Sequence, residues 1–232
     1  MRTVRLISAS VASPLLMIGL LLAAGQARAQ LHDGEWASYR DAYRAMVVFE
    51  KYGGPKNFLQ SQLQVLPRDP GVLGEGLQLT LAGKTTQLHL PLDPLGRTAL
   101  PLQKAAYDEN ATLALSRKGI SFALRPQVSI AARTDGVYDS ADLRSACGQA
   151  LGFARYADAS QRNRQCVGAR FVFSKKGEGG AHWRREGGAE EVLPVAPGAA
   201  EQGLPVVTYR FGSERGQVLT DSVPLAILPL FE

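Results

Sequence analysis

A period-two alternation of apolar and polar residues, repeated along much of the chain after Leu59, is the feature that most constrains the fold. Turns such as Lys118-Gly119 and Asp135-Gly136 separate the runs. The pattern is typical of half-buried strands in antiparallel sheets. It predicts an α+β fold that is mostly antiparallel β, arranged as a meander or a sandwich. The apolar members of the runs are Leu59/Leu63/Val65, Leu77/Leu79/Leu81, Leu88/Leu90/Leu92, Ala111/Leu113/Leu115, Ile120/Phe122/Leu124 and Val128/Ile130/Ala132.

A helical period appears first in the segment 30–54. Asp33 can cap a helix that begins near Glu35, and Gly53-Gly54-Pro55 would end it. An apolar stripe usually faces a core, and contact with a partner or a membrane surface is the alternative. The stripe consists of Trp36, Tyr39, Tyr43, Met46 and Val47.

A second helix is predicted at about 140–156. Asp139 or Ser140 would cap it, while Asp142 in its first turn and Arg155 in its last suit the helix dipole. Its apolar stripe is Leu143, Cys147, Ala150, Leu151 and Ala154.

The two cysteines of the chain, Cys147 and Cys166, are predicted to form a disulfide between this helix and the start of a strand. Free thiols or a metal pair are the alternatives. A zinc site needs four ligands, and a catalytic thiol needs a histidine as base. The three histidines, His32, His89 and His182, have no metal-ligand spacing to either cysteine.

The first 29 residues have the three parts of a secretory signal. Arg2 and Arg5 form a basic start, residues 15–24 are apolar, and Ala-Arg-Ala at 27–29 offers small residues for cleavage before Gln30. We therefore expect a periplasmic or secreted protein, in a compartment where disulfides persist. An uncleaved anchor is the alternative, although the run is short for a membrane span. No later stretch is apolar enough to cross a membrane.

The remaining segment, 55–232, is expected to form a single β-rich domain. Its Gly-rich part at about 175–205 shows little periodicity and is predicted to be a long mobile loop. The final apolar run contains Pro224 and Pro229, which favours a strand at the edge of a sheet. The chain has no basic run with interleaved aromatic residues, so nucleic acid is not an expected partner.

Several charged and polar side chains and one tyrosine crowd into the stretch between residues 90 and 119. They predict a polar ligand patch, and the alternative is a turn followed by a solvated connection. The candidate patch consists of Asp93, Arg97, Lys104, Tyr107, Asp108 and Arg117.

Sequence signatures of common enzymes are missing. The chain contains no G-x-S-x-G, H-E-x-x-H, phosphate-binding loop or G-x-G-x-x-G. We therefore predict no catalytic residue, cofactor or metal ligand. We expect a non-catalytic binding or accessory module whose partner is an envelope protein or a small ligand. The alternatives are a cell-envelope hydrolase that uses Lys104, Tyr107, Asp108 and His89, and a structural envelope component that associates through the N-terminal helix or the C-terminus.

Two phrases, L-x-L-P-L-D-x-x-G-R at 88–97 and D-G-V-Y-x-x-A-D-L-R-x-A-C at 135–147, resemble an uncharacterised family of secreted bacterial proteins. The resemblance covers most of the predicted mature chain and implies no activity and no site residues. The strand–D-x-x-G-R–strand rhythm is also similar to secreted β-sandwich modules of the carboxypeptidase-regulatory kind.

Overall fold

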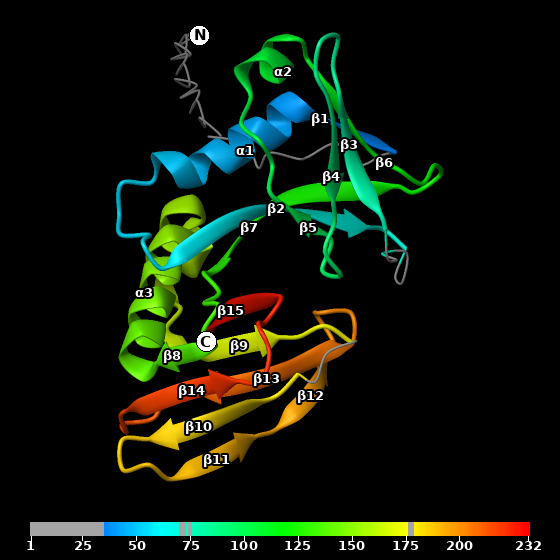
Figure 1. The fold of residues 1–232 in the computed structure, drawn as a ribbon. Coiled ribbons are helices and arrows are strands. Elements are labelled where there is room, and N and C mark those ends of the chain that lie inside the picture. Colours follow the sequence, from blue (N-terminus) through cyan, green and yellow to red (C-terminus); the bar gives the residue numbers. More distant parts are fainter. Residues whose placement is uncertain (1–34, 70–72, 74–75, 176–178) are drawn as a thin grey trace, which may run out of the picture.

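The computed structural model describes residues 35–69, 73, 76–175 and 179–232 (Figure 1). The predicted signal peptide at 1–29 and the predicted helix cap Asp33 lie outside these residues. Within them the chain has an α+β fold in which antiparallel sheets predominate, as the alternation predicted.

The strands of the described residues form three sheets. The N-terminal sheet has the order β1 (Trp36–Ser38), β6 (Thr112–Leu115), β3 (Gln78–Ala82), β4 (Gln87–Pro91). The C-terminal sheet has the order β11 (Glu190–Leu193), β10 (Ala181–Arg185), β14 (Gly216–Thr220), β8 (Val137–Asp139). The central sheet has the order β12 (Val195–Gly198), β13 (Leu204–Arg210), β9 (Cys166–Val172), β15 (Ala226–Phe231), β7 (Phe122–Ile130), β2 (Leu59–Pro67), β5 (Arg97–Thr98).

A long ribbon of β2 and β7 joins the two halves of the molecule. Its register runs from Leu59↔Ile130 to Pro67↔Phe122. Near Phe122 the ribbon contributes to an N-terminal core under the N-terminal sheet and helix α1 (Tyr39–Lys51). At Leu59 and Ile130 it contributes to a C-terminal core built with helix α3 (Ser140–Ala157) and strands β9, β10 and β13. The two cores therefore share one pair of strands (Figure 1).

Helix α1 begins later than the sequence predicted. Ser38 is its N-cap, and the Ser38 hydroxyl accepts a hydrogen bond from the amide of Asp41. Trp36 lies in strand β1, opposite Ala114 of β6, and so is not part of the helix. The helix buries Tyr39 and Met46, together with Ala42 and Phe49, and leaves part of its aromatic and aliphatic surface exposed.

The predicted disulfide is confirmed. Cys147 of α3 is bonded to Cys166 at the start of β9, and their Cα atoms are 5.9 Å apart. Asp139 is the N-cap residue of α3, whose bounds agree with the predicted helix. A short 3-10 helix, η1 (Ala159–Asn163), lies between the bonded residues.

The segment at 175–205 was predicted to be a mobile loop, and this prediction is wrong where the segment is described. It contains β10, β11 and β12. Only β10 has an alternating pattern, with Ala181 and Trp183 buried. The side chains of β11 and β12 are mostly exposed. Each of these strands lies at the edge of its sheet and is held by backbone pairing with one neighbour, β10 or β13. Such edge strands leave no apolar period in the sequence.

The C-terminal run was predicted to be an edge strand, and this too is wrong. Strand β15 lies between β9 and β7 in the middle of the central sheet. Pro229 is opposite Ala169 of β9, whereas β7 pairs with β15 at Ile227↔Ile130. The β7 ladder has ended before Pro229, so the missing amide proton of this proline leaves no gap on that side.

Candidate functional site

The six residues of the predicted ligand patch lie at three different places. Asp93 and Arg97 brace the turn between β4 and β5: Asp93 Oδ2 accepts hydrogen bonds from Arg97 Nε at 2.9 Å and Nη2 at 2.6 Å. Asp93 Oδ1 accepts from the amides of Leu95 and Arg97. The Arg97 side chain, only 1% exposed, also donates to the carbonyl of Leu225. This pair therefore ties the turn to the segment before β15.

Lys104, Tyr107 and Asp108 belong to the short helix α2 (Lys104–Asp108). Arg40 of α1 donates through Nε to the carbonyl of Tyr107 at 2.6 Å and through Nη2 to that of Asp108 at 3.0 Å. Lys104 and Asp108 form an exposed ion pair. These contacts fasten α2 to α1, while Arg117 is exposed in the turn between β6 and β7. The role of the six residues as one patch stays a prediction.

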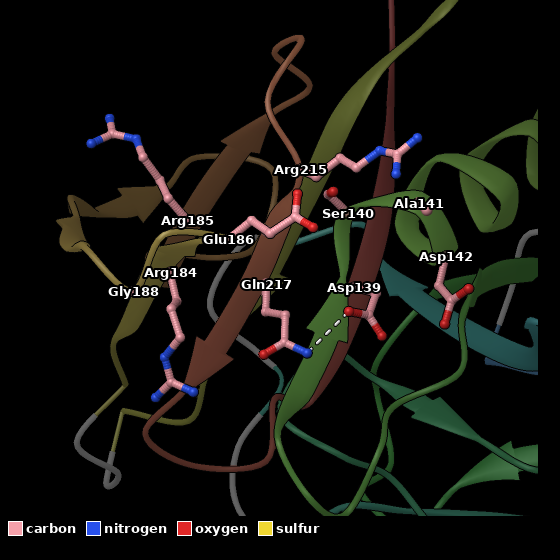
Figure 2. Close-up of a pocket in the computed structure, with 11 residues that line it drawn as sticks. Asp139, Ser140, Ala141, Asp142, Arg184, Arg185, Glu186, Gly188, Arg215 and Gln217 are labelled. Atoms are coloured by element: carbon pink, nitrogen blue, oxygen red, sulfur yellow. Dashed lines mark hydrogen bonds between the residues drawn. The ribbon is translucent and has the colours of Figure 1, made fainter.

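A charged cleft of about 580 Å³ lies where β8 leads into α3, beside β14 and the turn between β10 and β11 (Figure 2). Its residues come from three distant segments, which explains why sequence reasoning did not find it. The lining residues are Asp139, Ser140, Ala141, Asp142, Arg184, Arg185, Glu186, Gly188, Arg215, Gly216 and Gln217.

Arg184, Arg185 and Asp139 of the charged cleft have partners within the protein. Arg184 pairs with Glu190 at 2.7 Å, and Arg185 pairs with Glu214 and Glu191. Gln217 donates to Asp139, which makes no side-chain cap bond to α3 (Figure 2). These ion pairs are about half exposed and stabilise the protein little. No lining residue is a histidine or a cysteine, so the cleft lacks the usual base and thiol of nucleophilic catalysis.

A second hollow, the helical groove, runs along the exposed face of α1. It has a volume of about 390 Å³. Tyr107 of α2 lies at one end, where its ring centroid is 5.0 Å from that of Tyr43. Tyr156 of α3 contributes from the other side, where its ring is tilted against that of Tyr52 with 5.1 Å between the centroids. The lining residues are Tyr43, Arg44, Val47, Val48, Lys51, Tyr107 and Tyr156.

The helical groove combines apolar surface with positive charge. Val48 is 37% exposed and Tyr156 is 58% exposed, and both line the same groove. Arg44 and Lys51 are the charged lining residues, and both are cationic. Arg44 has Asp41 at 3.6 Å and donates to the Tyr107 hydroxyl. The groove therefore offers aromatic and aliphatic contacts beside a basic edge. Of the α1 residues that line the groove, only Tyr43 and Val47 belong to the apolar stripe predicted from the sequence.

The described histidines lie apart from these sites. His89 on β4 hydrogen-bonds Thr80 of β3 at 3.3 Å, and His182 on β10 lies 3.1 Å from Asp221. Among residues 35–69, 73, 76–175 and 179–232, no group of three or more His, Cys, Asp or Glu side chains is placed to hold a metal ion. In the same residues, no helix has the length and apolar character needed to cross a membrane.

A scan of family models, a search of curated proteins and a search of solved structures gave no match to this chain. The resemblance to secreted bacterial proteins therefore draws no support from these comparisons. The fold defines the class, a disulfide-bonded α+β protein with antiparallel sheets.

Proposed function

We propose that the protein is an exported, non-catalytic binding module that holds a partner protein in the helical groove. The observation that carries this proposal is the groove itself. Contiguous exposed apolar surface with a polar rim is typical of protein interaction sites, and Tyr and Arg are enriched there. Because Arg44 and Lys51 line it, the partner segment is expected to carry apolar side chains flanked by acidic residues.

The proposed export rests on the signal-like N-terminus and on the disulfide. The bond between Cys147 and Cys166 suits the periplasm or the extracellular space, where thiols are oxidised. The hydrolase alternative draws no support from the geometry. His89 lies on β4, where it hydrogen-bonds Thr80 of β3, whereas Tyr107 and Asp108 lie on α2, whose backbone carbonyls are bonded to Arg40 of α1.

Site-specific photo-crosslinking in the cells that make the protein tests this function. A photoreactive residue at Val48 or Tyr156 is expected to give one discrete adduct with a second protein. The same residue at Val223, which is exposed between β14 and β15, should give none. Lys51→Glu should abolish the adduct by reversing the charge of the basic edge, while Lys118→Glu in the β6–β7 turn should leave it unchanged.

Adducts from Val223 as strong as those from Val48 would contradict the proposal, and so would the absence of any adduct from the groove. An adduct with lipid, or with a second copy of this chain, would assign the groove to a membrane surface or to self-association instead.

A further inference from the structure

A third hollow lies between the two halves of the molecule, on the face of the ribbon opposite α1. Strand alternation places Gln64 and Leu66 on the face opposite Leu63 and Val65, which belong to the N-terminal core. We call this hollow the cationic pocket, and its volume is about 510 Å³. Its lining residues are Gln64, Leu66, Pro67, Asp69, Leu73, Arg125, Lys175, Ala199, Ala200 and Gln202.

Arg125 of β7 is the central cation of the pocket. Its Nε donates to Gln64 Oε1 at 2.9 Å. Gln64 is itself fixed, because it is only 6% exposed and donates through Nε2 to the carbonyl of Leu95 at 3.0 Å. The arginine is thus held by a neutral side chain on one edge, with its two terminal nitrogens available to a ligand.

Within the described part of the chain, Arg125 has no carboxylate partner. Although its side chain reaches solvent, partial burial lowers the pKa of Arg125 below its ordinary value. A guanidinium facing a protein carboxylate would show the opposite shift. A partly desolvated cation without a counter-charge costs folding free energy. The same cation is well suited to bind an anion through charge-assisted hydrogen bonds.

Two further features shape the pocket. Lys175, which follows β9, adds a second cation, and Asp69 is the acidic residue among the lining side chains. Gln202, in the turn between β12 and β13, has a φ of 57°, a left-handed conformation that is uncommon for residues other than glycine and asparagine. Backbone strain of this kind is concentrated at binding sites.

The apolar half of the lining consists of Leu66, Pro67, Leu73, Ala199 and Ala200. A hollow of this size, in which apolar side chains lie beside a few convergent polar groups, is large enough for a small organic molecule. We propose that the cationic pocket binds a small aliphatic carboxylate, whose carboxylate group lies against Arg125 and Lys175 and whose chain lies against the apolar wall. This site is separate from the helical groove and does not depend on the proposed partner protein.

Isothermal titration of the disulfide-bonded mature chain with octanoate, at constant ionic strength, tests the proposal. Octanoate is expected to bind one site, with octanamide, acetate and inorganic phosphate each weaker by about tenfold or more, because both the charge and the chain contribute. Arg125→Gln and Lys175→Gln should each weaken octanoate by about tenfold, the effect of losing one charge-assisted contact. Arg125→Lys should recover part of the loss.

Two control variants separate this site from the rest of the surface. Arg117→Gln in the exposed β6–β7 turn and Lys51→Gln in the helical groove should leave the octanoate affinity unchanged. The proposal is overturned if octanoate does not bind, if octanamide or phosphate binds as tightly, or if Lys51→Gln weakens binding more than Arg125→Gln. Lys175→Gln keeps the test valid if Arg125→Gln does not fold, because Lys175 is exposed.

Discussion

At the scale of single residues, the pair of Asp93 and Arg97 is the most exacting charge arrangement described. Arg97 is buried, and Asp93 accepts two hydrogen bonds from the Arg97 side chain and two more from backbone amides. Removing one partner of a buried ion pair leaves the other uncompensated, at a cost of about 3 kcal/mol. Asp93→Ala should therefore lower the free energy of unfolding by about that amount in urea titrations.

Asp108→Ala is the matched control, since Asp108 pairs with Lys104 on an exposed helix surface. Such pairs contribute at most about 0.5 kcal/mol. If the two variants have the same stability, Arg97 is not held as described. The result would also bear on the predicted ligand patch, because a residue that stabilises a turn by this much has a sufficient structural reason to be there.

Asp135, in the turn between β7 and β8, gives a prediction for pH. Hydrogen bonds from Arg133, and one from the Val137 amide, lower the pKa of Asp135 to about 2. Since the folded pKa lies below the ordinary value, the ionised carboxylate stabilises the turn above pH 4, and this contribution is lost as the pH falls toward 2. An NMR titration of the carboxyl should show a midpoint near pH 2.

Arg133→Gln removes the largest cause of this shift, so the midpoint of Asp135 should rise toward pH 4. An unchanged midpoint in that variant would mean that the backbone amide alone depresses the pKa.

At the scale of elements, the disulfide fastens α3 to β9. In the chain-entropy model a bridge across this separation stabilises a protein by about 3 kcal/mol. Adding a reductant should therefore lower the melting temperature without unfolding the protein at room temperature, because both cores remain. The double variant Cys147→Ala/Cys166→Ala should melt at the temperature of the reduced protein, and its melting temperature should not change when reductant is added. A wild-type melting temperature that does not respond to reduction would contradict this.

The elements also show what the sequence can predict. Strands with one buried face, such as β3 with Leu79 and Leu81, could be predicted because burial of one face makes apolar and polar residues alternate along the sequence. Helix α3 was readable from its stripe and charges. Strands β11 and β12 were not, since their stability comes from backbone pairing with β10 and β13. None of the three sites was readable as a unit, because each assembles side chains that only the tertiary fold brings together.

At the scale of the whole molecule, the shared ribbon predicts that both halves unfold together. The two tryptophans report on different halves: Trp36 lies on β1, and Trp183 lies in the C-terminal core. Single-tryptophan variants Trp36→Phe and Trp183→Phe should give coincident urea transitions by fluorescence. Phe122→Ala, which opens the N-terminal core, should destabilise by about 4 kcal/mol and shift the transition reported by Trp183 as well.

If the Trp183 signal ignores Phe122→Ala, the halves are independent folding units that happen to share two strands.

The position of β15 in the central sheet determines when that sheet can form during synthesis of the chain. Without β15, the central sheet falls into two parts, β12-β13-β9 and β7-β2-β5. This strand leaves the ribosome after every other strand of its sheet, so the sheet cannot close while synthesis continues. Late closure of this sheet suits the export proposed above, because a chain passes through a translocation channel in an unfolded state. Strand β15 therefore completes the central sheet only after the other six strands of that sheet have been made.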